Sequence, residues 1–249
     1  MALVSIVMPA YAAERFIAAA LDSVRAQSMD DWECLVVDDA SPDRTAEIAA
    51  AAAAADSRFR LLRQPENRGV AAARNAALAA ATGRYVAFLD ADDLWLPAKL
   101  ERQVGFMRES GAGMSYTAFR RIDESGARVG RLIAAPPRMT WQRLLKNTAI
   151  ATLTVMLDRE KTGPVQMTAA RRDDMILWLT LMQRGVVALG LNEDLARYRV
   201  VRGSLSSRRV RAAGWVWDVY REQAGLGRLR SLWSLGHYAA HAYLKRLRF

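Results

Sequence analysis

Cysteine and histidine are scarce in this chain, which excludes several kinds of site. The one cysteine, Cys34, allows no internal disulfide, as expected of a protein in a reducing cytoplasm. Cys34 lies in an apolar segment, which indicates a buried structural thiol rather than a nucleophile. His237 and His241 both lie near the C-terminus, so neither a familiar Cys/His zinc site nor a Ser-His-Asp hydrolase is expected.

Long apolar runs and glycine-rich phosphate loops are also missing. Runs such as "GVVALGL" fall far short of the roughly 18 residues that a membrane span needs, so we predict no transmembrane helix. The N-terminal "MALVSIVMPAY" lacks the basic region and cleavage site of a signal peptide and is interpreted as a first buried strand. Neither G-x-G-x-x-G nor G-x-x-x-x-G-K-[ST] occurs, which removes the usual support for a dinucleotide or P-loop site.

Charge is unevenly distributed along the chain. The formal net charge is +10, and from Arg199 onward eleven Lys/Arg face only Asp218 and Glu222. The body is therefore nearly neutral and the tail is basic. This asymmetry points to an anionic partner, such as nucleic acid or a membrane surface, or to a solvated charged face.

Apolar segments alternate with helical patterns over the first hundred residues. Strands are predicted at residues 3–9, 32–39, 59–64 and 85–90, with helices at 12–28, 42–58 and 69–83. This alternation predicts a parallel sheet with helices on both faces. Later segments predict a hairpin around Ser125-Gly126, a short helix at 140–147, a strand at 151–159 and a helix at 173–185 that Gly185 ends.

Acidic side chains follow two of the predicted parallel strands. Asp38 and Asp39 end the second strand, and Asp90 ends the fourth, with Asp92 and Asp93 next. Ligand sites in such sheets lie at the carboxyl ends of the strands, so both clusters are expected at one edge. In extended chain, Asp90 and Asp92 point to the same side, where their oxygens suit Mg²⁺ or Mn²⁺. A solvated turn and a proton-transfer pair are the alternatives.

Four segments together resemble a known family. They are "VSIVMPAYAAERFIAAALDSVRAQS", "WECLVVDDASPDRT", "NRGVAAARNAALAAATGRYVAFLDADD" and "RRDDMILWLTLMQRG". Their order and spacing resemble those of the inverting family 2 glycosyltransferases of the GT-A fold, especially bacterial enzymes that build cell-surface polysaccharides. The resemblance covers residues 3 to about 207 and implies an α/β, Rossmann-like fold with a mostly parallel central sheet flanked by helices. It implies a nucleotide-sugar-binding half (1–113) and an acceptor-binding half (114–207) of one domain (1–207), before a basic helical extension (208–249).

The resemblance also implies roles for individual residues on the donor side. Those that match the nucleotide pocket are Pro9, Ala10, Tyr11, Glu14, Asp39, Arg74 and Asp90. Asp39 matches the carboxylate that contacts the base, and Arg74 matches the cation near the diphosphate. Asp90 and Asp92 match the family's D-x-D, with Asp92 the closer match to the metal ligand and Asp90 nearer the ribose. The expected cofactor is Mn²⁺ or Mg²⁺.

Asp173-Asp174 matches the family's second acidic pair. Asp174 takes the place of the catalytic base, which removes the proton of the attacking sugar hydroxyl. Asp173 either takes part in the chemistry or caps the following helix.

Three other aspartates are assigned to local structure. Asp38 and Asp43 are expected to cap or terminate local elements, since Asp43 lies near a helix start. Asp93 is expected to cap the helix that Pro97 helps to begin.

Two positions depart from the family pattern. Ala12 replaces the asparagine of P-x-Y-N, and Val201, followed by Arg202, replaces a histidine that assists the metal or the diphosphate in some relatives. We expect Arg202 to contact the diphosphate. The alternative is that its loop only closes over the donor.

The C-terminal segment has a basic amphipathic pattern. Its apolar residues recur at helical spacing: Leu229, Leu232, Trp233, Gly236, Ala240, Tyr243, Leu244 and Leu247. We expect this helix to dock on an anionic membrane surface, and packing on the domain is the alternative.

These patterns predict a metal-dependent inverting glycosyltransferase that uses a nucleotide sugar, with UDP favoured, and a saccharide or lipid-linked acceptor. One alternative is a sugar-phosphate nucleotidyltransferase, although "PAYAAERF" is not the glycine-rich basic loop of that class. The other is a non-enzymatic basic protein that binds membrane or nucleic acid. We expect a cytoplasmic protein, peripheral on the inner membrane, without a nucleic-acid partner.

Overall fold

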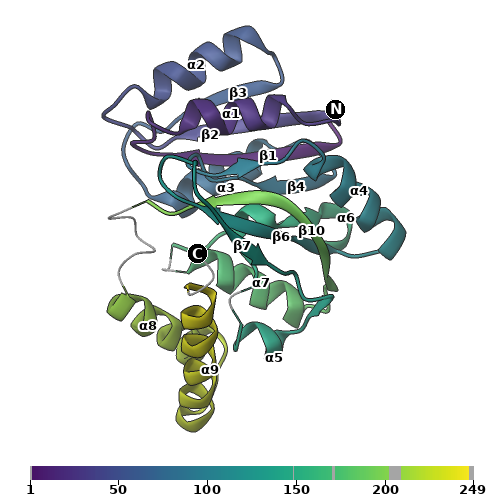
Figure 1. Cartoon of the computed structure of the whole chain (residues 1–249), viewed down its shortest axis with the longest axis vertical. Helices are drawn as coiled ribbons and strands as arrows, with labels where there is room; N and C mark the ends of the chain where they lie inside the picture. The colour runs from purple at the N-terminus through teal and green to yellow at the C-terminus, as the bar shows by residue number, and fades with distance from the viewer. Residues whose placement is uncertain (1, 148, 170–171, 202–208, 247–249) are drawn as a thin grey trace.

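The computed structural model describes residues 2–147, 149–169, 172–201 and 209–246 of the chain. Figure 1 shows the sheet at the centre and the helices α8 and α9 together at the lower end. The strands are β1 (Val4–Ala10), β2 (Trp32–Asp38), β3 (Phe59–Arg63), β4 (Tyr85–Phe88), β5 (Leu94–Trp95), β6 (Met114–Ile122), β7 (Val129–Ile133), β8 (Arg138–Met139), β9 (Met156–Asp158) and β10 (Ala188–Arg199). The helices are α1 (Ile17–Arg25), α2 (Thr45–Ala55), α3 (Val70–Ala80), α4 (Lys99–Ser110), α5 (Trp141–Leu144), α6 (Arg159–Thr162), α7 (Asp173–Gln183), α8 (Arg209–Asp218) and α9 (Arg228–Arg246), with a 3-10 turn η1 (Thr152–Thr154) and a π-helical turn η3 (Val219–Gln223).

The first four strands form the parallel half of the sheet. β1 pairs with β2 and β4, and β2 pairs with β3, all in parallel. The register sets Ala10 of β1 beside Asp38 of β2. The carboxyl ends of these strands therefore meet at one edge, where Tyr11, Asp39 and Asp90 follow β1, β2 and β4.

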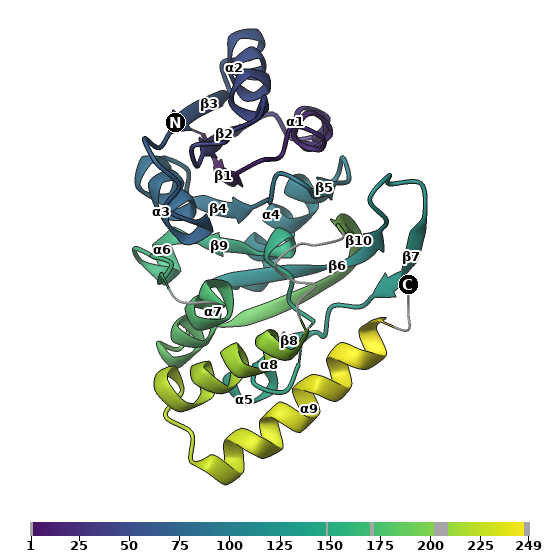
Figure 2. The same ribbon diagram turned by 90° about the vertical axis from the view of Figure 1, so that its left-hand side faces the viewer.

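Helices cover both faces of the sheet, as predicted. α1, α2 and α4 contribute to one apolar cluster, and α3 and α7 to the other; Figure 2 shows α1 and α3 on opposite sides of β1 and β2. Side chains of β1 alternate between the clusters, with Ile6 and Met8 in one and Val7 in the other. Cys34 is buried, and burial raises the pKa of its thiol, which confirms the structural assignment.

The second half of the sheet is mixed in direction. β9 lies between β4 and β6 and is antiparallel to both, whereas β10 is parallel to β6. The predicted hairpin is the β6–β7 pair, and α7 ends before Gly185, whose φ is +85°. The predicted strand at 151–159 is shorter, because its first part forms the turn η1. No strand was predicted from the sequence over the residues of β10, because register shifts interrupt the alternation of its side chains.

The C-terminal helix α9 is present, and its apolar face points away from the domain. α9 packs through Ser231, Ser234, Leu235 and Tyr238. On its other side, Leu229, Leu232 and Trp233 are 84%, 58% and 64% exposed. The side chains of Tyr243, Leu244 and Leu247 lie outside the described residues. Within the part of the chain that the structure describes, no helix has both the length and the apolar character to cross a membrane.

Three non-glycine residues among those described have left-handed backbone conformations. They are Ala12, Ala40 and Arg172, with φ of 48°, 57° and 67°. Each is adjacent in sequence to a residue with a predicted site role. Strained backbone of this kind concentrates at functional sites, because only the surrounding structure maintains it.

Replacing Ala12 by asparagine is expected to raise the free energy of unfolding by about 0.5–1 kcal/mol, because asparagine tolerates the left-handed region better than alanine. The turn itself is held by the Ala12 amide, which donates to Ser41 Oγ at 3.1 Å. Urea unfolding measures the change. The same substitution at the exposed Ala19 of α1 is the control, with an expected loss of about 0.5 kcal/mol from helix propensity. A loss at Ala12 as large as that at Ala19 contradicts the prediction.

Candidate active site

Arg74, on α3, joins two acidic segments that lie far apart in the sequence. Its Nη2 donates to Asp90 Oδ1 at 2.7 Å, and its Nη1 donates to Asp173 Oδ2 at 3.1 Å. Arg74 is only 5% exposed, so these ion pairs are largely shielded from water. The D-x-D after β4 and the Asp173-Asp174 pair at the start of α7 therefore belong to one site.

Asp173 pairs with Arg74 and lies inside the first turn of α7, whereas Arg172 occupies the N-terminal flanking position. Burial raises the pKa of Asp173, although the Arg74 guanidinium opposes that shift. Its negative charge also lies in the first turn of α7, where the helix dipole favours an anion. Asp173 therefore helps to connect α7 with α3.

Asp92 presents a half-buried carboxylate at the same edge. Within the described residues, no other residue donates a hydrogen bond to this carboxylate. Burial, and then the charge of Asp90, raise the pKa of Asp92 to about 6. The backbone around it is fixed by Arg199, whose Nε donates to the Asp92 carbonyl oxygen at 2.7 Å. The backbone of Asp92 is thus held in place, and among the described residues only its own N–H donates to its carboxylate.

Asp93 does not cap a helix, so that part of its prediction is wrong. α4 begins at Lys99, after Ala98 as its N-terminal flanking residue. The Asp93 carboxylate is instead fully buried and accepts from the Arg199 backbone N–H at 2.7 Å, and burial raises its pKa well above the usual value. Asp93 and Arg199 together attach the D-x-D turn to the end of β10.

Asp90 and Asp92 fit a divalent cation of the hard, oxygen-preferring type. Both offer carboxylate oxygens, and no other residue in the described part of the chain donates to Asp92. No group of three His, Cys, Asp or Glu that could hold a metal occurs among the described residues. Mg²⁺ and Mn²⁺ suit such a site, because one or two carboxylates are enough when water and phosphate oxygens complete the shell.

Asp39 organises the loop that leads into α3. Its Oδ1 accepts from the Arg68 N–H and its Oδ2 from the Gly69 N–H, both at 2.8 Å. Gly69 has a φ of +85°, which glycine adopts without strain. The Gln64 side-chain amide also donates to Asp39 Oδ1, at 3.0 Å. Oδ2 keeps a second lone pair, which is the acceptor that the predicted contact with a base requires.

The other predicted nucleotide residues lie along the end of β1. Pro9 and Ala10 are buried strand residues, and Tyr11, the next residue, is 52% exposed. Glu14 accepts from the Arg44 N–H at 3.1 Å through its Oε2, which connects this turn to the start of α2. The structure therefore brings these residues to the edge that also carries Asp39.

Asp38 and Asp43 serve local structure, as predicted. Asp43 accepts from the Glu14 and Thr45 N–H groups, both at 3.1 Å, at the beginning of α2. Asp38 accepts from the Ser41 N–H at 3.4 Å in the turn after β2.

Asp174 is oriented by a residue that sequence reasoning missed. Thr152 Oγ1 donates to Asp174 Oδ2 at 2.9 Å, and the Met175 N–H donates to Oδ1 at 2.8 Å. Thr152 belongs to η1, in a stretch interpreted as plain strand. The two donors fix the carboxylate at the start of α7 while it remains partly exposed.

The C-terminal helix α9 reaches the surroundings of Asp174. The Arg172 guanidinium carbon lies 5.9 Å from the centre of the Tyr238 ring. Burial raises the pKa of Tyr238, and the positive charge of Arg172 opposes that shift. Arg172 precedes Asp174 by two residues, so α9 packs beside the start of α7. The helical pattern of the sequence contains no signal for Tyr238, because it picks out the apolar face that α9 turns outward.

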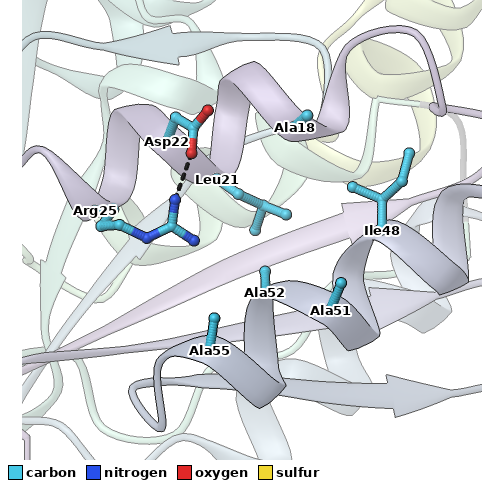
Figure 3. A pocket seen from close by; sticks show the side chains of 8 residues that line it. All are labelled: Ala18, Leu21, Asp22, Arg25, Ile48, Ala51, Ala52 and Ala55. Atoms are coloured by element: carbon cyan, nitrogen blue, oxygen red, sulfur yellow. Dashed lines mark hydrogen bonds and ion pairs between the residues drawn. The ribbon is translucent and has the colours of Figure 1, made fainter.

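A separate hollow of about 240 Å³ lies between α1 and α2 (Figure 3). Alanines dominate its lining, and its one ion pair joins Arg25 to Asp22. None of the predicted site residues lines it. Because Asp22 neutralises Arg25, the cation in its lining, the hollow suits a nucleotide sugar poorly.

Comparison with known proteins agrees with the motifs at this edge. The profile of the family described as "Glycosyl transferase family 2" matches residues 5–168, which include the D-x-D. This chain is a family 2 glycosyltransferase. Membership of the family decides against the nucleotidyltransferase and the non-enzymatic alternative. Asp173 and Asp174 lie just beyond the matched range, so their assignment depends on the Arg74 contact.

Two relatives of this glycosyltransferase cover most of its length. The putative teichuronic acid biosynthesis glycosyltransferase TuaG of Bacillus subtilis is 44% identical over 246 residues, which is 98% of each chain. The Escherichia coli UDP-Glc:alpha-D-GlcNAc-diphosphoundecaprenol beta-1,3-glucosyltransferase WfgD is 38% identical over 218 residues, 87% of this chain and 85% of that one.

Solved structures of low sequence identity show the same GT-A fold. S. aureus TarS 1-349 in complex with UDP-GlcNAc aligns with a TM-score of 0.71 at 18% identity, over 98% of this glycosyltransferase and 73% of that chain. The mannosyltransferase PcManGT of Pyrobaculum calidifontis, in complex with GDP-Man and Mn2+, aligns with a TM-score of 0.71 at 20% identity. The alignment covers 99% of this glycosyltransferase and 76% of that chain. The predicted fold class is confirmed.

Proposed function

We propose that this glycosyltransferase transfers a sugar, with inversion, from a UDP-sugar to a saccharide or lipid-linked acceptor of a bacterial surface polysaccharide. The observation that carries the proposal is the Arg74 bridge, which unites a D-x-D with a second acidic pair. The names of the relatives support the substrate classes, since WfgD uses UDP-Glc and a diphosphoundecaprenol acceptor and TuaG is assigned to teichuronic acid biosynthesis.

Asp174 is proposed as the general base. A sugar hydroxyl is a poor nucleophile until a base removes its proton as the new bond forms. Thr152 holds the Asp174 carboxylate in a fixed orientation. Asp173 already forms an ion pair with Arg74, so Asp174 is the member of the acidic pair that is available to the acceptor. The acceptor half is accordingly assigned to residues 114–207.

The donor is assigned to residues 1–113. Pro9, Ala10, Tyr11, Glu14 and Asp39 form the proposed nucleoside side, while Arg74 and Asp90 lie toward the diphosphate. Asp92, with Asp90, is proposed to hold Mn²⁺ or Mg²⁺, and the bound cation supplies positive charge to the departing nucleoside diphosphate. Arg202, the further candidate for the diphosphate, lies outside the described residues.

A panel of nucleotide sugars with Mn²⁺ or Mg²⁺, followed by nucleoside diphosphate release, tests this function. The Asp92→Asn variant is expected to lose about 100-fold or more in turnover, because an amide is a much weaker ligand for a hard cation. Asp22→Asn, on the exposed surface of α1, is the control and should behave like the wild type. Wild-type turnover by Asp92→Asn, or no release with any donor, contradicts the proposal.

We also propose that α9 attaches the enzyme to the cytoplasmic face of the membrane. Its exposed Leu229, Leu232 and Trp233 form an apolar surface, and Arg228 and Arg230 beside them are exposed cations. Leu232→Gln combined with Trp233→Gln is expected to lower co-flotation with anionic vesicles about tenfold or more. Truncation of the tail is unsuitable, because it uncovers the packing surface of α9.

The matched control replaces two exposed valines outside α9. Val129→Gln combined with Val187→Gln removes apolar surface elsewhere on the molecule, from side chains that are 50% and 41% exposed. Equal losses in both double variants would show that general surface hydrophobicity, not α9, attracts the membrane.

A further inference from the structure

A basic hollow of about 310 Å³ lies between the α5 segment and α9. Its lining includes Pro136, Met139, Arg143, Lys146, Asn147 and His241. None of these residues has a role in the site described above. The hollow combines an apolar part with cationic and amide groups, which is typical of a site for an anionic group attached to a larger molecule.

The cations of the hollow are not neutralised by acids. In the part of the chain that the structure describes, neither Arg143 nor Lys146 forms an ion pair, and no carboxylate lines the hollow. Arg143 Nη1 donates to the Arg138 carbonyl oxygen at 3.1 Å, which steadies the side chain and leaves its other N–H groups available. Asn147 uses its Oδ1 to accept from the Ala149 N–H at 2.6 Å, so its amide N–H₂ is the group left to donate. Several donors without a carboxylate among them suit phosphate oxygens.

The hollow lies on the Asp174 side of the molecule. His241 follows Tyr238 by about one turn of α9, and the Tyr238 ring lies 5.9 Å from the guanidinium carbon of Arg172, which precedes Asp174 by two residues. The α5 segment is fixed to the C-terminal region as well, because the Tyr220 hydroxyl donates to the Leu145 carbonyl oxygen. An anion in the hollow would thus lie on the same side of the domain as Asp174, the residue proposed to activate the acceptor hydroxyl.

We propose that this hollow binds the diphosphate of a lipid-linked acceptor. In such an acceptor the diphosphate joins the sugar to the lipid, so a short distance separates the attacking hydroxyl from the anion. With the sugar at Asp174 and the diphosphate between Arg143 and Lys146, the lipid chain leaves along α9, whose Leu232 and Trp233 are exposed to a membrane. This inference rests on the proposed function and extends the acceptor side beyond residue 207.

Direct binding tests the hollow independently of turnover. Calorimetry in the presence of saturating UDP would measure the affinity of the full-length protein for a water-soluble short-chain prenyl diphosphate. The Arg143→Gln, Lys146→Gln double variant is expected to bind it about tenfold or more weakly, because charge-assisted hydrogen bonds to phosphate are lost. Arg102→Gln with Arg108→Gln, two exposed arginines of α4 on the opposite face of the sheet, is the matched control and should retain wild-type affinity.

Two further probes identify the source of the anion and separate this inference from the proposed function. Glycerol 1-phosphate, a fragment of an anionic lipid headgroup, should bind far more weakly than the prenyl diphosphate; equal binding overturns the assignment to an acceptor. Unchanged prenyl diphosphate affinity in the Arg143→Gln, Lys146→Gln double variant also overturns it.

The affinity for UDP should be the same in both double variants. A selective loss of UDP affinity in Arg143→Gln, Lys146→Gln would assign the hollow to the donor instead. A wild type without transferase activity refutes the proposed function but leaves the binding result intact.

Discussion

Replacing Asp174 by asparagine is expected to lower kcat for sugar transfer about 100- to 10,000-fold, which is the usual contribution of a general base. The amide preserves the size of the side chain, and its oxygen can still accept from Thr152. It cannot accept the acceptor's proton, so the effect falls on the chemical step. The KM for the donor should change little, because the donor is assigned to the other side of the Arg74 bridge. Initial rates of nucleoside diphosphate release at varied donor and acceptor give both constants.

Two threonines separate a chemical role of Asp174 from a structural one. Thr152→Val removes the hydroxyl that orients Asp174 and should lower kcat by a smaller factor, about tenfold. Thr180→Val removes a hydroxyl that donates to the Ile176 carbonyl oxygen within α7, away from the carboxylates, and should leave kcat unchanged. If Asp174→Asn keeps more than about a tenth of wild-type kcat, the base lies elsewhere.

Replacing Arg74 by methionine is expected to lower the free energy of unfolding by about 3–5 kcal/mol, because it leaves the buried Asp173 without its cation. Asp173 is 7% exposed, and burial already raises its pKa against the influence of Arg74. Without the guanidinium the charged form becomes costlier, so the carboxyl is expected to bind a proton more readily. Urea denaturation at neutral pH measures the loss.

A second substitution and a surface pair complete this test. Adding Asp173→Asn to Arg74→Met should recover part of the stability, since it removes the charge that was stranded. Arg102→Met breaks an exposed pair with Glu193 and should cost no more than about 1 kcal/mol. Equal losses for Arg74→Met and Arg102→Met would mean that the bridge does not contribute as a buried pair.

The parallel half of the fold was predictable because three of its four strands, β1, β2 and β4, are buried on both faces. Such strands are continuous apolar runs, and the alanine-rich segments between them have few alternatives to helix. β10 escaped prediction because it is partly exposed and its pairing shifts register twice, so neither an apolar run nor a strict alternation is present.

Site residues that belong to a sequence motif could be predicted. Those that act through a contact with a residue distant in sequence could not. Asp92 and Asp174 follow from motif matches. No motif indicates three other residues, because each acts through a partner distant in sequence. Thr152 contacts Asp174, Arg199 contacts the Asp92-Asp93 turn, and Tyr238 contacts Arg172. Asp93 was assigned to the wrong local role for the same reason, since its partner is the backbone of β10, about a hundred residues on.

The Arg74 bridge also limits how this enzyme can be re-engineered. Donor and acceptor specificity are often exchanged by joining segments of related enzymes, and a junction near residue 113 is the natural choice here. Arg74 lies before that junction and Asp173 after it. A hybrid whose second segment lacks an acid at the position of Asp173 would therefore contain a buried Arg74 that has lost one of its two carboxylate partners and keeps only Asp90. Successful hybrids should be those in which both parents carry this pair.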